Sequence, residues 1–376
     1  MRLSAATLRG FSACENKITM TASSNESLGP LLRRFSEKVR DETPALLRHY
    51  QATRDDGSIC YVDQPGQPRR VRPWCDAMEI AAAFGLIPDS MSKAEWIANL
   101  RSFQEPKSGR VPEHISDDSR FDPEPKEDPV YDDLYPTMIV NYALECVGSH
   151  LEYPVSVAEN ITAEKLDSVL EALPWRRSAW GVGGWIDVYA TCLHANREHF
   201  GLGLQAEHLI QWLSQHCDPQ SGVWGTPREE DRWLQPVNGF YRLTRGTYAQ
   251  FGRPLPYPEQ AMKTILHHSG DSEFFGEGRG HACNVLDVVH PFWLCLRQTD
   301  THRAEALEWV RTRLPATLDN WVPGQGMAFD PRGTDRSGEP GLQGTEMWLS
   351  IIYYMADLLG LKEHLVYSPK GVHEDW

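Results

Sequence analysis

The sequence predicts an all-α protein whose helices form an (α/α)6 toroid, a ring of six helical hairpins. Apolar residues recur at helical spacing in about twelve segments of the chain. No run alternates apolar and polar residues convincingly, so we expect no substantial sheet. Longer glycine-bearing turns alternate with short links at a period of roughly 50 residues, which is typical of helical repeats. Six hairpins closed on themselves would place six helices inside the ring and six outside it.

Start and stop signals mark the ends of several expected helices. Pro73 lies just ahead of the second segment, and Ser92 and Glu95 have the spacing of a capping box before the third. Gly85 follows the second segment, and the run WGVGG at 180–184 predicts one of the longer turns. The expected helices span residues 28–53, 74–85, 92–103, 133–150, 162–173, 184–199, 204–217, 238–251, 257–268, 281–298, 301–316 and 343–359.

The order of these expected helices predicts a single toroid domain over residues 27–362. Residues 1–26 lack the apolar core of a secretory signal and are expected to be a disordered N-terminal segment. The segment 107–132 is rich in proline and acidic residues, which indicates a surface loop or flap. Residues 363–376 are expected to form a C-terminal tail.

Composition limits the classes of partner. The 376 residues carry a net charge of −15, from 52 acidic and 37 basic residues, which argues against nucleic acid or a polyphosphate ligand. Eight cysteines lie scattered without a CxxC pair, which favours reduced thiols in a cytoplasmic protein. No stretch approaches the roughly 18 apolar residues of a membrane span. No glycine-rich segment has the order of a phosphate-binding loop, so we predict no cofactor.

The apolar segment HACNVLDVVHPFWLCLR at 281–297 contains the first candidate site. Cys283, Asp287 and His290 fall at i, i+4 and i+7, on one face of the expected helix. A carboxylate and an imidazole are costly to bury unless they are paired, hydrogen-bonded or facing a wet cavity. The alternative for His290 is a structural role at the kink imposed by the proline that follows it. The three groups would span about 10 Å along the helix, so we predict no metal site.

Polar and aromatic residues gather near the N-terminal ends of the expected inner helices. If the longer turns all lie at one end of the ring, these helix ends surround a central funnel. Acidic residues are also favoured in first turns because they offset the helix dipole, and this structural role is the alternative for each carboxylate. The candidate catalytic residues are Asp76, Asp133, Asp187, His194, Asp287, His290 and Glu346. The candidate substrate-binding residues are Trp74, Tyr135, Trp185, Tyr189, Asn238, Tyr241, Cys283, Asn284 and Trp348.

The run LSQHCDPQSGVWG at 213–225 resembles the repeats of the prenyltransferase and squalene-cyclase superfamily, in which a glutamine leads to Gly-x-Trp. Gln215 lies farther from Gly222 than the family spacing, and most of the other turns lack the tryptophan. Neither the DxDD acid motif of the cyclases nor the Asp-x-Cys of the zinc-dependent members occurs. Similar six-hairpin toroids are found among glycoside hydrolases, polysaccharide lyases and sugar epimerases. The resemblance implies the architecture of residues 28–360 and leaves the activity open.

Several chemistries fit such a funnel. Asp187 and Asp287 would serve glycoside cleavage as a carboxylate pair. A histidine with a tyrosine would instead abstract a proton, as lyases and epimerases require, and His194 or His290 is the candidate base. The candidate acids are Tyr135, Tyr189 and Tyr241.

Aromatic rings beside separate polar groups suit sugars. We therefore expect an enzyme that binds a sugar or oligosaccharide in the funnel and acts as a hydrolase, lyase or epimerase. An isoprenoid-type cyclase with a carboxylic acid at the rim is the first alternative. A toroid that serves only as a binding scaffold is the second.

Overall fold

The computed structural model describes residues 9–54, 56–67, 69–112, 129–276 and 279–373, without the side chains of 9–26 and 129–133. About 60% of the chain is helical and 5% is in strands, which confirms the all-α class. The helices are α1 Arg9–His49, α2 Arg72–Ala83, α3 Lys93–Ser102, α4 Pro129–Cys146, α5 Ser156–Glu159, α6 Ala163–Ala172, α7 Ala179–Phe200, α8 Ala206–His216, α9 Leu234–Thr244, α10 Pro258–Ser269, α11 Ser272–Phe275, α12 Ala282–Leu296, α13 Arg303–Leu318 and α14 Leu342–Leu358.

Short strands form two small antiparallel sheets. They are β1 Gln51–Thr53 with β2 Ile59–Tyr61, and β3 Met327–Ala328 with β4 Pro340–Gly341. Gln51 lies opposite Tyr61 in the first sheet, and Met327 lies opposite Gly341 in the second. The first sheet packs against α2 through β2, and the second packs against α14. Among the described residues, no helix has both the length and the apolar character needed to cross a membrane.

Each expected helical segment overlaps an observed helix, and the capping residues explain several of the ends. The Ser92 side chain accepts a hydrogen bond from the Glu95 amide at 3.3 Å, and the Glu95 carboxylate accepts one from the Ser92 amide at 2.8 Å. Thr162 caps α6 in the same way through the Lys165 amide. Gly201, at a φ of 69°, ends α7 in the left-handed conformation that favours glycine.

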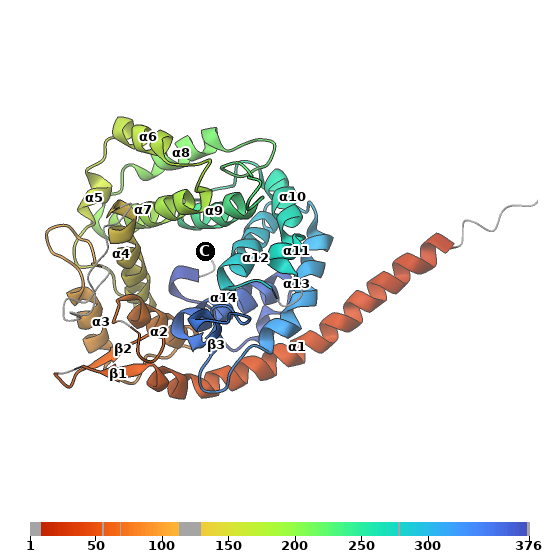
Figure 1. Ribbon diagram of the computed structural model, residues 1–376, viewed down its shortest axis with the longest axis horizontal. Helices are drawn as coiled ribbons and strands as arrows, with labels where there is room; N and C mark the ends of the chain where they lie inside the picture. The colour runs from red at the N-terminus through yellow and green to blue at the C-terminus, as the bar shows by residue number, and fades with distance from the viewer. Residues whose placement is uncertain (1–8, 55, 68, 113–128, 277–278, 374–376) are drawn as a thin grey trace, which may run out of the picture.

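Six helices pack side by side in a closed ring (Figure 1). Around it, α2 contacts α4, α4 contacts α7, α7 contacts α9, α9 contacts α12, α12 contacts α14, and α14 returns to α2. Other helices pack against the outside of this ring, among them α3 on α4, α10 on α12 and α13 on α14. These six helices are the ones that the sequence predicts as the inner layer.

The closest helix pair in the ring depends on glycine. The run at 180–184, expected as a turn, instead lies within the first turns of α7. A Cβ atom on Gly183 would lie 2.3 Å from the carbonyl oxygen of Gly239 in α9, and one on Gly239 would lie 2.4 Å from the carbonyl oxygen of Ala179. The glycines therefore permit the two backbones to approach each other, rather than to turn. Beyond this contact, α9 continues into a π-helix over Arg245–Ala249.

Residues 363–373 of the expected tail run into the centre of the ring (Figure 1). The Ser368 amide donates to the Ala83 carbonyl at the end of α2, and the Val372 amide donates to the Glu79 carboxylate at 2.9 Å. Gly371 has a φ of 73°, and a Cβ atom there would lie 2.5 Å from the Glu79 side chain. The segment ends in a helical turn, Gly371–His373, that packs against α4. Most of the segment 107–132, which the sequence predicts to be a flap, lies outside the described residues.

Candidate functional site

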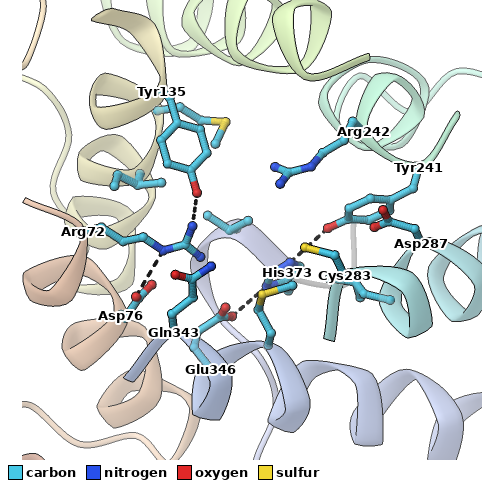
Figure 2. A pocket seen from close by; sticks show the side chains of 15 residues that line it. Arg72, Asp76, Tyr135, Tyr241, Arg242, Cys283, Asp287, Gln343, Glu346 and His373 are labelled. Carbon is cyan, nitrogen blue, oxygen red and sulfur yellow. Dashed lines mark hydrogen bonds and ion pairs between the residues drawn. The ribbon is translucent and has the colours of Figure 1, made fainter. Parts of the chain in front are cut away.

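A narrow cavity lies inside the ring (Figure 2). The space between its lining atoms is about 440 Å³, part of it open to solvent, and the centre of a water-sized sphere can occupy about 20 Å³ of it. Five of the ring helices and the turn at 371–373 line it. Most of its lining side chains are polar or ionisable. These are Arg72, Asp76, Tyr135, Tyr241, Arg242, Cys283, Asp287, Gln343, Glu346 and His373. The lining residues of α2, α12 and α14 belong to the first turns of their helices, which is the end that the sequence assigns to the funnel.

A chain of hydrogen bonds joins three side chains that are distant in the sequence. Nδ1 of His373 lies 2.6 Å from the Glu346 carboxylate, and Nε2 lies 3.0 Å from the Tyr241 hydroxyl (Figure 2). Burial raises the pKa of Tyr241 well above its ordinary value, so the phenol keeps its proton. The tyrosine hydroxyl therefore donates to Nε2, and His373 donates from Nδ1 to Glu346.

The surroundings of Glu346 and Asp287 shift their pKa values in opposite directions. Burial would raise the pKa of Glu346, but the His373 partner and Arg72 outweigh burial and bring it below its ordinary value. Asp287 is 1% exposed, and neither of its carboxyl oxygens has a hydrogen-bond partner among the described residues. Burial raises the pKa of Asp287 well above its ordinary value, although Arg242 acts against it. The ionised form is thus favoured at Glu346 and the neutral form at Asp287, as in enzymes that divide acid and base roles between two carboxyls.

Arg72 organises the opposite wall of the cavity. Its Nε lies 3.2 Å from Oδ2 of Asp76, and its guanidinium also donates to the Tyr135 hydroxyl (Figure 2). Burial raises the pKa of Asp76 to about 7, with Arg72 opposing this shift and Glu346 adding to it. Asp76 is therefore a third buried carboxyl, one that titrates near neutral pH.

An ion pair beneath the cavity holds the turn at 371–373 in place. Asp187 is fully buried and binds the Arg245 guanidinium, which is 1% exposed. Arg245 in turn donates to the Val372 carbonyl at 3.2 Å. A guanidinium nitrogen of Arg242 lies 3.8 Å from the same Asp187 oxygen. Asp187, expected to be catalytic, does not line the cavity, and its described contacts are structural.

A wider vestibule adjoins the cavity at the N-terminal ends of α7 and α9. It contains about 1690 Å³ of space between atoms, part of it open to solvent. Arg242 lines both the vestibule and the inner cavity. Trp185, predicted to bind substrate, lines the vestibule and stacks on Tyr189 with the ring centroids 5.1 Å apart. Because Arg242 lines both spaces, we interpret them as two parts of one passage.

The structure places His290 outside the cavity lining. Its ring is enclosed by Tyr241, Trp293 and Tyr354, with centroid distances of 5.1, 5.5 and 5.2 Å. Neither ring nitrogen has a hydrogen-bond partner among the described residues. Burial lowers the pKa of His290 well below its ordinary value, with the cationic neighbours adding to the shift, so the ring is neutral at physiological pH. Cys283 and Asp287 therefore line the cavity, whereas His290, farther along the same helix face, does not.

Several other candidates lie in packed surroundings. Trp74 packs edge-on against Tyr61 and Trp96, and the Trp348 indole donates to the Ala328 carbonyl. The remaining placements are a buried Tyr189 hydroxyl that donates to the Ala158 carbonyl, a His194 ring against Phe251, and an Asn238 amide that donates to Asn284 at 3.2 Å. The Asp133 side chain lies outside the described part of the chain.

Sequence reasoning missed the cavity arginines and His373. Arg72 stands next to the proline that marks the start of α2, and Arg242 and Arg245 lie three residues apart near the end of α9. Two arginines at that spacing in a buried helix are a usable signal, because arginine is almost never buried without a partner. His373 had no such signal, since it lies in a segment without helical periodicity. No group of histidine, cysteine and acidic side chains among the described residues has the arrangement of a metal site.

No protein-family model, curated protein or solved structure matches the chain.

Proposed function

We propose that the inner cavity is the active site of an enzyme that abstracts a proton from a sugar or oligosaccharide, acting as a lyase or epimerase. The observation that carries the proposal is the hydrogen-bonded series Glu346, His373 and Tyr241, which ends at a hydroxyl in the cavity. A carboxylate that holds an imidazole in one tautomer, and an imidazole that holds a hydroxyl, form the arrangement by which enzymes activate weak bases and nucleophiles.

The proposed reaction begins at Tyr241. Its oxygen takes a proton from a carbon of the sugar while its own proton passes to Nε2 of His373. The imidazolium that forms is stabilised by the Glu346 carboxylate on Nδ1. In an elimination, the carbon–oxygen bond then breaks, a carbon–carbon double bond forms, and neutral Asp287 gives its proton to the leaving oxygen. In an epimerisation, Asp287 returns a proton to the opposite face of the same carbon.

The lining of the passage supports a sugar substrate. Arginine, glutamine, carboxyl and tyrosine side chains supply separate hydrogen-bonding groups in the cavity, and Trp185 lies in the vestibule. Sugars need many directional hydrogen bonds together with an aromatic surface. An isoprenoid-type cyclase calls for a mostly apolar cavity, so this lining favours it less. A cytoplasmic location, suggested by the scattered cysteines, belongs to the same proposal.

Glycoside hydrolysis is the second candidate, and a specific observation favours it. Asp76 and Asp287 are both buried, line the same cavity, and have raised pKa values, with that of Asp76 at about 7. In this version, neutral Asp287 protonates the glycosidic oxygen and ionised Asp76 activates water or attacks the sugar. Hydrolysis adds water to the products, whereas elimination leaves an unsaturated sugar and epimerisation leaves the mass unchanged.

A turnover screen with matched tyrosine variants tests the proposal. The purified protein is incubated with mixed oligosaccharides, and the products are identified by mass spectrometry. We expect Tyr241→Phe to lower the rate by about 100-fold or more, as general acid–base catalysis implies. Tyr189→Phe is the control, because Tyr189 is equally buried and its hydroxyl donates to a carbonyl outside the cavity. Products that have gained water, formed equally well by Tyr241→Phe, would contradict the proposal.

A further inference from the structure

Residues 368–373, which we call the strap, close one side of the inner cavity. Val372 and His373 line this cavity, and they are the two described lining residues that belong to no ring helix. With the strap in place, the cavity has room for about one water molecule. A ligand larger than water therefore cannot reach the Tyr241 hydroxyl while every lining group keeps its position.

Single hydrogen bonds from ring side chains hold the backbone of the strap. The Tyr354 hydroxyl of α14 donates to the His373 carbonyl at 2.7 Å, and the Arg245 guanidinium donates to the Val372 carbonyl at 3.2 Å. The Glu79 carboxylate of α2 accepts the Val372 amide at 2.9 Å. Most of the strap lies outside the described helices and strands, so regular main-chain hydrogen bonding does not secure it. Only a small number of bonds therefore have to break for the strap to leave the ring.

A second, smaller cavity lies beside the strap. Pro369 and Lys370 line it together with Glu79 of α2 and Glu346 of α14. The space between its lining atoms is about 220 Å³, part of it open to solvent. Protein interiors leave few such voids, because the atoms around a void lose contacts with one another. Incomplete packing on this side of the strap makes its release less costly.

The residue that precedes the strap anchors it to the ring. Tyr367 is 5% exposed, and its ring packs against Phe84 with the centroids 5.1 Å apart. Its hydroxyl donates to the Leu349 carbonyl of α14 at 2.8 Å. These contacts belong to Tyr367 and not to the strap, so the strap remains tethered beside the cavity when its own bonds break.

We infer that the strap is a movable closure of the inner cavity, which undocks to admit a ligand and docks again afterwards. The inference goes beyond the proposed function, because it concerns access to the cavity whatever ligand enters. Undocking also carries the His373 imidazole away from the Tyr241 hydroxyl and the Glu346 carboxylate (Figure 2). Docking of the strap therefore closes the cavity and assembles this hydrogen-bonded series in one step. Closing elements commonly complete a catalytic site while they exclude water from it.

Alkylation of Cys283 by N-ethylmaleimide measures how often the cavity opens in the full-length protein. Cys283 lines the inner cavity and is 9% exposed, and the reagent is much larger than a water molecule. Burial raises the pKa of Cys283 to about 12, so the enclosed thiol reacts slowly. Cys295 lies on the same helix, is fully buried and is not among the described residues that line the cavity, so it reports global unfolding instead. Mass spectrometry of the digested protein gives the two rates separately.

Gly371→Ala weakens the docked strap without changing a ring residue. Its φ is 73°, and a Cβ atom there would lie 2.5 Å from the Glu79 side chain. We expect Cys283 to react about fivefold faster or more in this variant, because the rate follows the fraction of open molecules. Gly360→Ala is the control, since Gly360 has a φ of 69° but a Cβ atom there meets no described atom within 4 Å. The control introduces similar backbone strain and should leave the Cys283 rate unchanged.

Tyr354→Phe weakens docking from the side of the ring. It removes the hydroxyl that donates to the His373 carbonyl, and we expect Cys283 to react about fivefold faster. Tyr248→Phe is the control, because it removes a similarly buried hydroxyl that bonds to Ser214 at 2.8 Å instead of to the strap.

The inference predicts faster alkylation at Cys283 alone in both strap variants. Unchanged Cys283 rates in Gly371→Ala and Tyr354→Phe would overturn it, because the cavity would then open elsewhere or stay closed. Equal acceleration at Cys295 would also overturn it, since the variants would then unfold the whole domain instead of releasing the strap.

Discussion

Replacing Asp76 by asparagine tests whether burial or the neighbouring arginine decides the charge of a cavity carboxyl. Asp76 is 4% exposed, and Nε of Arg72 lies 3.2 Å from its Oδ2. Burial raises the pKa of Asp76 from 3.8 to about 7, against the opposing effect of Arg72. The carboxyl should therefore be largely neutral below neutral pH, despite its cationic partner.

The sign of the effect on stability follows from proton linkage. A carboxyl whose pKa is higher in the folded protein than in the unfolded chain binds more protons when folded. Its contribution to the free energy of unfolding is complete below the unfolded pKa and is lost as the pH rises toward the folded pKa. For Asp76, a rise of about three pKa units at ~1.36 kcal/mol each gives a loss of about 4 kcal/mol between pH 3.8 and about 7.

Urea unfolding of the wild type and Asp76→Asn at several pH values measures this loss. Asparagine does not titrate, so the difference between the two proteins isolates Asp76 from the other ionisable groups. Between about pH 5 and 7, the wild type should lose about 2 kcal/mol relative to the variant. A difference that stays constant over this range would refute the reasoning, because Asp76 would then be ionised throughout as the partner of Arg72.

Three further substitutions test other parts of the site. His373→Asn should lower turnover by about 100-fold, with partial rescue by added imidazole, and unchanged turnover would exclude the relay. Asp187→Asn should lower the free energy of unfolding by about 3–5 kcal/mol in urea titrations, because it leaves the Arg245 charge buried, and a loss below about 1 kcal/mol would contradict this. Gly371→Ala should destabilise the protein by more than about 1 kcal/mol, because Gly371 has a positive φ and a Cβ atom there would clash with Glu79. Proteolysis near residue 371 should therefore increase. An unchanged digestion pattern would argue against this role of Gly371.

The helices were predictable because their signals are local. Apolar spacing, the Ser92 capping box and the stop at Gly85 act within a few residues, and the observed helices follow them. The turn expected at 180–184 was wrong because two helices meet there. Its glycines serve the close approach of α7 to α9, and no local pattern separates that use of glycine from a turn.

The cavity was predictable only where position along a helix was enough. Asp76, Asp287 and Glu346 were found because each lies in an early turn of a ring helix, so that closing the ring brings them together. Trp74 and Trp348 lie in equally early turns but face the packing between layers, since the register of a helix face against its neighbours is not a local property. The position of His373 depends on the path of residues 363–373 through the ring, which no periodicity in that segment indicates.

Exchange of solvent deuterium into recovered sugar tests the central claim most directly. In heavy water, an enzyme that abstracts a proton from carbon through Tyr241 either returns deuterium to that carbon or, where elimination follows, leaves an unsaturated sugar, and mass spectrometry detects both. We predict one of these two outcomes for the wild type and for Tyr189→Phe, and neither for Tyr241→Phe or His373→Asn. Turnover by the wild type that adds water to an oligosaccharide, with neither carbon-bound deuterium nor an unsaturated sugar, would contradict proton abstraction and favour hydrolysis through Asp76 and Asp287.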